Sequence, residues 1–333
     1  MLSRLRLDPF LLAIICAALV ASVLPARGSA VPVVDAVVAA AIFLLFFLYG
    51  ARLAPHEAVA GLKHWRLHGV ILAFTFVVFP LVGMLALPGL RAALGGDLAS
   101  GLLYVCLVPS TVQSSIAFTS IARGNVAGAI VSASVSNLVG VVLTPLLVVA
   151  LMTTTGTVEV TGSAFVDILV QLLLPFVLGQ VAGHWIRGWV KAHAAPLKLV
   201  DRGSIVLVVY SAFSAGMREG IWSRVTLPQL GGVLVVCLLL LAALLWLTRA
   251  VAQRLGFGRG DVIAIQFCGT KKSLASGLPM AMVLFAGQPV GLMVLPLMVF
   301  HQAQLMACSA LAARYGREAD AVGDAADGVG RVA

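Results

Sequence analysis

Charge is scarce in this sequence of 333 residues. Only 11% of the residues are Asp, Glu, Lys or Arg, whereas a soluble globular domain carries about 25%. The 13 acidic residues lie in loops, near the ends of apolar runs or in the C-terminal tail. This composition excludes a soluble globular protein. It also leaves any cation at the centre of an apolar run without a carboxylate at the same depth.

Motifs of enzymes and metal sites are missing as well. The five cysteines fall one per apolar run, with no CxxC and no His/Cys spacing that suits a metal. There is no HExxH, and GTKKS lacks the upstream glycine of a phosphate-binding loop because position 264 is Ala264. Nothing supports pairing Ser273 with His301 as a catalytic dyad. Without these motifs we expect no enzyme. The net charge is +9, but the basic residues are scattered over short loops, so we also expect no nucleic-acid partner.

Apolar runs of about 20 residues, the length that spans a bilayer, recur along the whole chain. We therefore predict an all-α polytopic membrane protein whose partner is the lipid bilayer. Its ten transmembrane helices are expected at about residues 9–26, 33–53, 68–90, 98–121, 125–152, 163–187, 201–218, 227–250, 260–285 and 289–314.

The loop charges favour this count. With both termini in the cytoplasm, sixteen basic residues fall on the inner side: Arg4, Arg6, Arg52, Lys63, Arg66, Arg123, Arg187, Lys191, Lys198, Arg202, Arg249, Arg254, Arg259, Arg314, Arg317 and Arg331. Four fall on the outer side: Arg27, Arg91, Arg218 and Arg224. Cytoplasmic loops are enriched in Lys and Arg, so the pattern predicts a bacterial-type inner-membrane protein with both termini inside.

The N-terminus imitates a secretory signal peptide, since Arg4 and Arg6 precede an apolar run at 10–24 and small residues at 28–30. We expect a retained first helix, because its removal would leave nine spans and break the charge pattern.

The ten spans divide into two halves of five, 1–153 and 163–315, followed by a polar tail at 316–333 that is expected to be disordered. Five is an odd number, so the second half must be inverted relative to the first. In each half the fourth span is interrupted by polar residues, at 108–120 and at 269–276. Paired interruptions of this kind are typical of a transporter binding site.

The second interruption holds two adjacent lysines, Lys271 and Lys272. Lys271 lies ten residues from Asp261 and fourteen from Phe285, which is roughly 15 Å and 20 Å at a rise of about 1.5 Å per residue. An ammonium group at that depth cannot easily reach bulk water, and such groups usually face a cavity or pathway. Neighbours on a helix point about 100° apart, so we expect only one lysine, preferably Lys271, to face the cavity.

The candidate binding residues are the polar and small residues at the two interruptions and on the spans beside them. They are Ser110, Thr111, Gln113, Ser114, Ser115, Thr119, Ser136, Asn137, Gly269, Thr270, Lys271, Lys272, Ser273, His301 and Gln304. His301 and Gln304 share a helix face, whereas Gln302 is expected to point elsewhere. The alternative for any single hydroxyl is a bond to its own backbone at a kink, and for Ser136 a helix-packing contact. His301 equally suits a helix-to-helix hydrogen bond.

Three segments, 106–147, 265–281 and 300–315, resemble the bile acid:sodium symporter superfamily, and GTKKSLASG at 269–277 resembles the branch that carries a GTKKS signature. The resemblance implies two inverted five-helix repeats, with broken, crossing helices 4 and 9 that hold sodium sites. It also implies one partly matched sodium site at Ser115, Thr119, Ser136 and Asn137. Lys271, however, falls where sodium-coupled members have a glutamine, and Phe267 or Gln266 falls near their glutamate.

Three functions compete. The leading one is a secondary transporter that carries a small organic anion by alternating access, with the lysines attracting the anion or standing in for a coupling cation. The second is a proton-coupled exporter or antiporter in which a buried lysine titrates. The third is a membrane regulatory protein that has lost transport, which the polar residues at both interruptions disfavour. No bound cofactor is expected, apart from Na⁺ as a candidate coupling ion.

Overall fold

The computed structural model describes residues 9–52, 64–153, 162–218, 220, 223 and 225–330, and every long element in that part of the chain is a helix. The helices are α1 (Pro9–Val23), α2 (Ala30–Arg52), α4 (Trp65–Ala73), the π-helix η2 (Phe74–Val78), α5 (Phe79–Leu94), α6 (Gly96–Leu107), α7 (Gln113–Ile121), α8 (Val126–Leu147), the π-helix η3 (Val148–Thr153), α9 (Gly162–Ala192), α10 (Ala194–Arg218), α12 (Leu227–Arg254), α13 (Arg259–Thr270), α14 (Leu274–Leu284) and α15 (Val290–Gly330).

Six continuous helical segments in the described part are long and apolar enough to cross a membrane. They are Ala30–Arg52, Trp65–Leu94, Val126–Thr153, Ala194–Arg218, Leu227–Arg254 and Val290–Ala321. The other four predicted spans fall on α1, on α9 and on the broken pairs α6–α7 and α13–α14. The chain is thus a multi-pass membrane protein. Arg4, Arg6 and residues 154–161, where we placed the division between the halves, lie outside the described residues.

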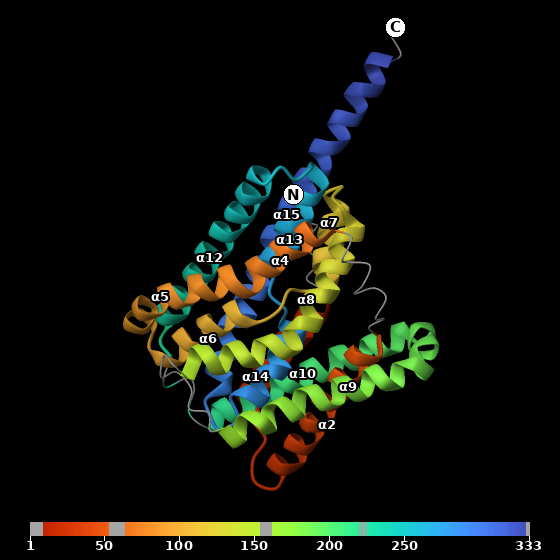
Figure 1. Ribbon diagram of the computed structural model, residues 1–333. Helices are drawn as coiled ribbons and strands as arrows, with labels where there is room; N and C mark the ends of the chain where they lie inside the picture. Colours follow the sequence, from red (N-terminus) through yellow and green to blue (C-terminus); the bar gives the residue numbers. More distant parts are fainter. Residues whose placement is uncertain are drawn as a thin grey trace.

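Four helices form one group, in which α2 packs along α9 (Figure 1) and α1 packs along α10. The α2–α9 contact is close because glycine lies at the point of approach. A Cβ atom added at Gly179 would lie 1.9 Å from the carbonyl oxygen of Phe47, so only glycine fits there. The remaining helices form a second group in which α12 packs on α13 and α6 packs on α5 and α15.

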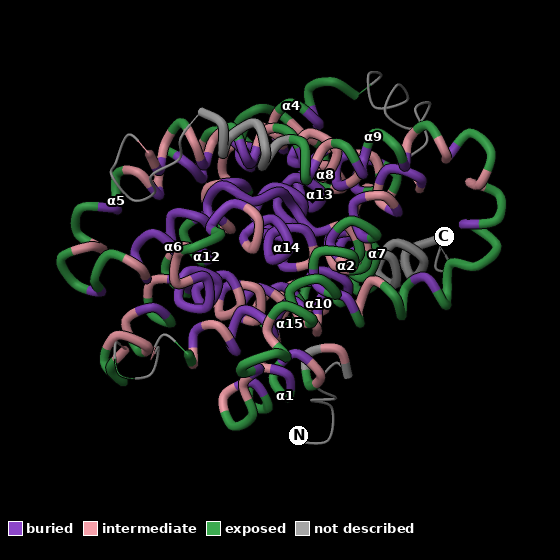
Figure 2. Tube along the Cα trace, turned by 90° about the horizontal axis from the view of Figure 1, so that it is seen from below, coloured by how far each residue is buried: buried purple, intermediate pink, exposed green. Residues whose placement is uncertain are grey.

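The broken helices occupy the interior. Residues 98–107 of α6 and 262–270 of α13 are all buried, and Figure 2 shows α6, α13 and α14 at the centre, with the exposed turns of α1, α5 and α9 outside. A helix that is apolar and buried on every side is typical of the centre of a bundle. The polar interruptions are therefore held away from lipid by surrounding protein.

The tail differs from its expected disorder, because α15 continues as a helix to Gly330 and projects beyond the other helices (Figure 1). Alanine and arginine recur after residue 309 and have high helix propensity. Arg314 and Glu318 form an i,i+4 ion pair at 2.8 Å, which contributes little to stability because both side chains are exposed to solvent.

Candidate functional site

The first break separates α6 from α7 at residues 108–112, around Pro109. Val108 is extended, with ψ at 155°, as a residue before proline prefers. The freed backbone groups have side-chain partners: Thr144 donates to the Leu107 carbonyl at 2.9 Å, and Asn137 donates to the Ser110 carbonyl at 2.6 Å. The Ser110 amide in turn donates to the Ser136 hydroxyl at 3.1 Å. Polar residues on α8 therefore satisfy the backbone groups that the break frees.

The second break separates α13 from α14 at residues 271–273. The side-chain amide of Gln304 replaces the missing helix partners of Lys272: its oxygen accepts from the Lys272 amide at 2.8 Å, and its nitrogen donates to the Lys272 carbonyl at 2.7 Å. Gln304 also contacts His301, which lies 3.3 Å from the same carbonyl. Ser273 caps α14 by accepting from the amide of Ser276.

The two breaks contact each other directly. The Ser273 amide donates to the Pro109 carbonyl at 2.8 Å, and the Ser110 hydroxyl donates to the Cys268 carbonyl at 2.6 Å. Asn137 joins both sides, because its oxygen accepts from the Ser276 hydroxyl at 3.2 Å. The structure thus brings the two interrupted spans together at one crossing, as the sequence predicts. Backbone left unpaired at membrane depth must be satisfied by protein or cavity, and here protein satisfies most of it.

Lys272 is fully buried at this crossing. Its ammonium nitrogen lies 2.9 Å, 3.0 Å and 2.9 Å from the carbonyl oxygens of Thr75, Cys106 and Val108. It also lies 4.1 Å from the centre of the Phe79 ring. The three N–H groups of an ammonium therefore match three acceptors, and the positive charge sits at the negative C-terminal end of α6.

Lys271 is equally buried but differently surrounded. Its ammonium nitrogen donates to the Ser114 carbonyl at 3.1 Å. It lies 3.5 Å from the centre of the Phe118 ring and 5.6 Å from that of Phe267. Neither lysine lines the cavity beside the crossing. We chose Lys271 as the cavity-facing lysine, but the backbone at 271 is extended rather than helical and the ammonium donates to the Ser114 carbonyl instead of lining the cavity.

That cavity has a volume of about 430 Å³ and lies between the two helix groups. Six of the predicted residues line it: Thr111, Gln113, Ser114, Asn137, Ser273 and His301. The others do not, and lie around the crossing: Ser110, Ser115, Thr119, Ser136, Gly269, Thr270, Lys271, Lys272 and Gln304. Thr119 donates to the carbonyl of Ser115 in its own helix. This local backbone bond is the alternative to a binding role that we gave for any single hydroxyl. Gln302, which we expected to point elsewhere, lines the cavity.

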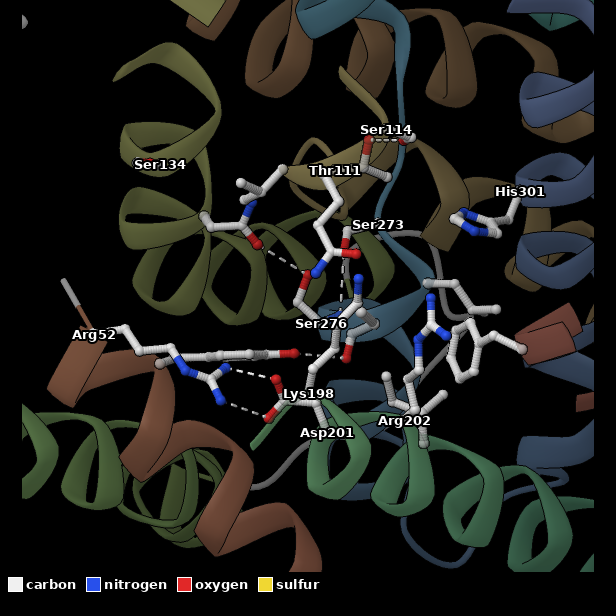
Figure 3. A pocket seen from close by; sticks show the side chains of 18 of the residues that line it. Arg52, Thr111, Ser114, Ser134, Lys198, Asp201, Arg202, Ser273, Ser276 and His301 are labelled. Atoms are coloured by element: carbon white, nitrogen blue, oxygen red, sulfur yellow. Dashed lines mark hydrogen bonds and ion pairs between the residues drawn. The ribbon is translucent and has the colours of Figure 1, made fainter. Parts of the chain in front are cut away.

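The opposite side of the cavity holds charged residues that our candidate residues omit (Figure 3). They are Arg52 on α2 and Lys198, Asp201 and Arg202 on α10. Arg52 and Asp201 form an ion pair at 2.6 Å, and the guanidinium of Arg202 lies 5.2 Å from the centre of the Phe10 ring. In the sequence these residues stand at span ends. The positive-inside pattern counts Arg52, Lys198 and Arg202 as loop charges and gives no hint of Asp201.

The sequence matches known transporters along almost its whole length. Residues 8–317 match the SBF-like CPA transporter family. The chain belongs to that family. It is similar to the putative symporter YfeH of Escherichia coli (strain K12), at 47% identity over 94% of each chain. It is also similar to the sodium/bile acid cotransporter 7 of Rattus norvegicus, at 28% identity over 93% of each chain. The predicted resemblance is thereby confirmed, and the relatives are transporters rather than enzymes.

For this SBF-like transporter, the four residues that the resemblance assigns to a sodium site lie on two helices, Ser115 and Thr119 on α7 and Ser136 and Asn137 on α8. Thr119 bonds within α7, and Ser115 lies beside Thr111 at 3.1 Å and the Phe267 carbonyl at 3.4 Å. Ser136 and Asn137 instead bond the first break from α8. A hard cation needs several oxygen ligands around a single centre. A hydroxyl oxygen that donates its hydrogen keeps lone pairs for a cation, so the sodium site stays a prediction.

Proposed function

We propose that this protein is a secondary transporter that carries an amphipathic organic anion by alternating access, with the cavity as its binding site. The observation that carries the proposal is the polarity of the cavity. Hydroxyl and amide groups from both helix breaks line one side, and three basic side chains stand at the other (Figure 3). Such an arrangement suits a ligand that has an apolar body and a negative group.

The cavity has apolar walls. Ile14, Leu138, Val141, Phe176 and Leu305 also line the cavity. A small-molecule pocket of about 300–1,000 Å³ typically combines such walls with a few placed polar groups. The name of the rat relative, a sodium/bile acid cotransporter, supports an amphipathic anion as the class of substrate.

Many transporters achieve alternating access by moving two related halves against each other, and the paired broken helices support an inverted repeat here. Each predicted half contains one broken helix, and in each case a half-helix of 12 residues precedes the break. We place Arg52, Lys198 and Arg202 on the cytoplasmic side by the positive-inside rule. The cavity would then open to the cytoplasm of a bacterial-type inner membrane, with both termini inside and ten spans in all.

A proton-coupled carrier or exporter is the second candidate, and Lys271 favours it. Its ammonium has one carbonyl partner in the described part of the chain and otherwise faces aromatic rings. Loss of the Lys271 proton would disturb one hydrogen bond to a carbonyl, whereas loss of the Lys272 proton would disturb three. The ring contacts favour the charged form, so a change of state at Lys271 would couple proton binding to the packing of α7.

Uptake into proteoliposomes tests the proposal. Labelled taurocholate, a steroid sulfate and a short aliphatic carboxylate are supplied with a Na⁺ gradient, a pH gradient or neither. We expect uptake of an amphipathic anion, reduced in Asn137→Leu at the cavity and unchanged in Leu239→Ala on the exposed face of α12. Folded protein that moves none of these anions under any gradient would favour the regulatory alternative. Uptake driven by the pH gradient alone would favour proton coupling.

A further inference from the structure

The cage around Lys272 is assembled from backbone that other elements leave unpaired. Its ammonium nitrogen contacts the carbonyls of Thr75, Cys106 and Val108, all within 3.0 Å. Thr75 belongs to η2, Cys106 to the end of α6 and Val108 to the first break. The cation itself comes from the second break, so one side chain joins three separate stretches of chain.

The Thr75 carbonyl is free for a local reason. In η2 the amide of Phe79 donates to the carbonyl of Phe74, one residue further back than in an α-helix. The next amide would serve Thr75, but position 80 is Pro80, which has no N–H. The π-helix and the proline together turn one carbonyl out of the backbone ladder and toward Lys272.

The other two carbonyls are free because α6 ends at the break. The amide of Ser110, which would bond the Cys106 carbonyl in a continuous helix, donates to Ser136 instead. Val108 has extended backbone, so its carbonyl leaves the helix direction. These oxygens lie at the negative end of α6, and the face of the Phe79 ring adds further negative potential on one side.

Three converging backbone carbonyls at the end of a half-helix form the environment in which membrane proteins bind Na⁺ or K⁺. The described residues place no carboxylate in an ion pair with Lys272. The charge of its ammonium is therefore balanced by carbonyl dipoles and the face of the Phe79 ring, much as the charge of a bound alkali ion would be.

We propose that the Lys272 ammonium is a covalently attached substitute for a monovalent metal ion in this cage. The three carbonyls then always have a cation between them, and the ammonium occupies the position that Na⁺ would need where the two breaks meet. This inference concerns what holds the crossing together, and it goes beyond the proposed function because it does not depend on which substrate is carried.

Thermal unfolding of the purified protein tests it, in NaCl, KCl and choline chloride at one concentration of about 0.15 M so that screening is constant. We expect the Tm of the wild type to be equal in the three salts. Lys272→Ala should lower the Tm in choline chloride, because the three carbonyls lose their donor. Na⁺ or K⁺ together with water should then enter the vacated space and raise that Tm by roughly 4 °C or more.

Two variants serve as controls. Lys272→Met removes the charge but fills the space, so its Tm should be lowered and should not respond to the cation. Lys271→Ala removes an equally buried lysine with one carbonyl partner, and it should also show no cation response. If Lys272→Ala does not fold in choline chloride, Lys272→Ser replaces it, since its hydroxyl offers the ion one more oxygen.

The inference is overturned by any of three results. One is a wild type that NaCl stabilises as strongly as it stabilises Lys272→Ala. Another is a folded Lys272→Ala or Lys272→Ser that responds to no cation. The third is failure of both to fold in NaCl while Lys272→Met folds. Because the assay contains no transport substrate, failure of the uptake experiment and failure of this inference are separate outcomes.

Discussion

The crossing of the broken helices and the basic side of the cavity are both positively charged, but they hold their charge differently. At the crossing, Lys272 is fully buried and three backbone carbonyls accept its hydrogen bonds. At the cavity, Arg52 is partly exposed and paired with Asp201, and Lys198 and Arg202 form no ion pair in the described part of the chain. A buried cation saturated by carbonyls stabilises structure, whereas cations beside an open cavity remain available to an anion.

The largest expected effect is a loss of folding stability at Lys272, and its absence would contradict the structural role of this lysine. Lys272→Met should lower the free energy of unfolding by about 3 kcal/mol, because it leaves three buried carbonyls without a charged donor. Lys271→Met, which loses one carbonyl contact and two ring contacts, should cost less. Unfolding in mixed detergent micelles, with Leu239→Ala as the control, measures both. Equal costs for the two lysines would contradict the assignment of the structural role to Lys272.

The next prediction tests the hydrogen bonds of the Lys272 backbone separately from those of its side chain. Gln304→Met removes the two hydrogen bonds that replace helix at the second break, and we expect a loss of about 2 kcal/mol. Thr144→Val is the matched control at the first break, because it removes a single bond to the Leu107 carbonyl, and it should cost about 1 kcal/mol. If Gln304→Met were neutral in the same unfolding assay, the lysine side chain alone would position the second break.

Both breaks could be predicted from the sequence because their causes are local. Pro109 disfavours helix at its neighbour, and the run at 269–276 places polar residues and two lysines inside an apolar span. The partners of those lysines could not be predicted. The Thr75 carbonyl is left without a backbone donor because of a π-helix, which we did not predict from the sequence. The charges at the cavity were hidden for another reason, since Arg52 and Asp201 lie 149 residues apart and meet only when α2 packs near α10.

A smaller effect concerns the residue that joins the crossing to the cavity. Asn137 lines the cavity and bonds both breaks, so Asn137→Leu should reduce anion uptake by roughly tenfold, the equivalent of about 1.4 kcal/mol. Ser134, on the same helix, also lines the cavity but has no hydrogen bond to a break among the described residues, and Ser134→Ala should change uptake less. A larger loss in Ser134→Ala would show that the contact with substrate matters more than the bridge between the breaks.

The smallest effect tests the basic side of the cavity. Arg202→Gln should raise the KM for the anion by about 2–5-fold and leave the Tm unchanged, because a partly solvated charge contributes long-range attraction rather than folding energy. Asp201→Asn should shift KM in the opposite direction, since it removes the one acidic group beside the three basic ones and releases Arg52 from its ion pair. Salt provides the discriminating measurement. Both shifts should shrink as ionic strength rises from about 0.05 M to 0.5 M, where the Debye length falls well below the size of the cavity, whereas Lys272→Met should keep its full cost in unfolding across that range. A KM shift for Arg202→Gln that salt does not diminish would mean that this guanidinium bonds the substrate directly, and the cavity would then have a specific anion contact on α10 rather than a diffuse positive field.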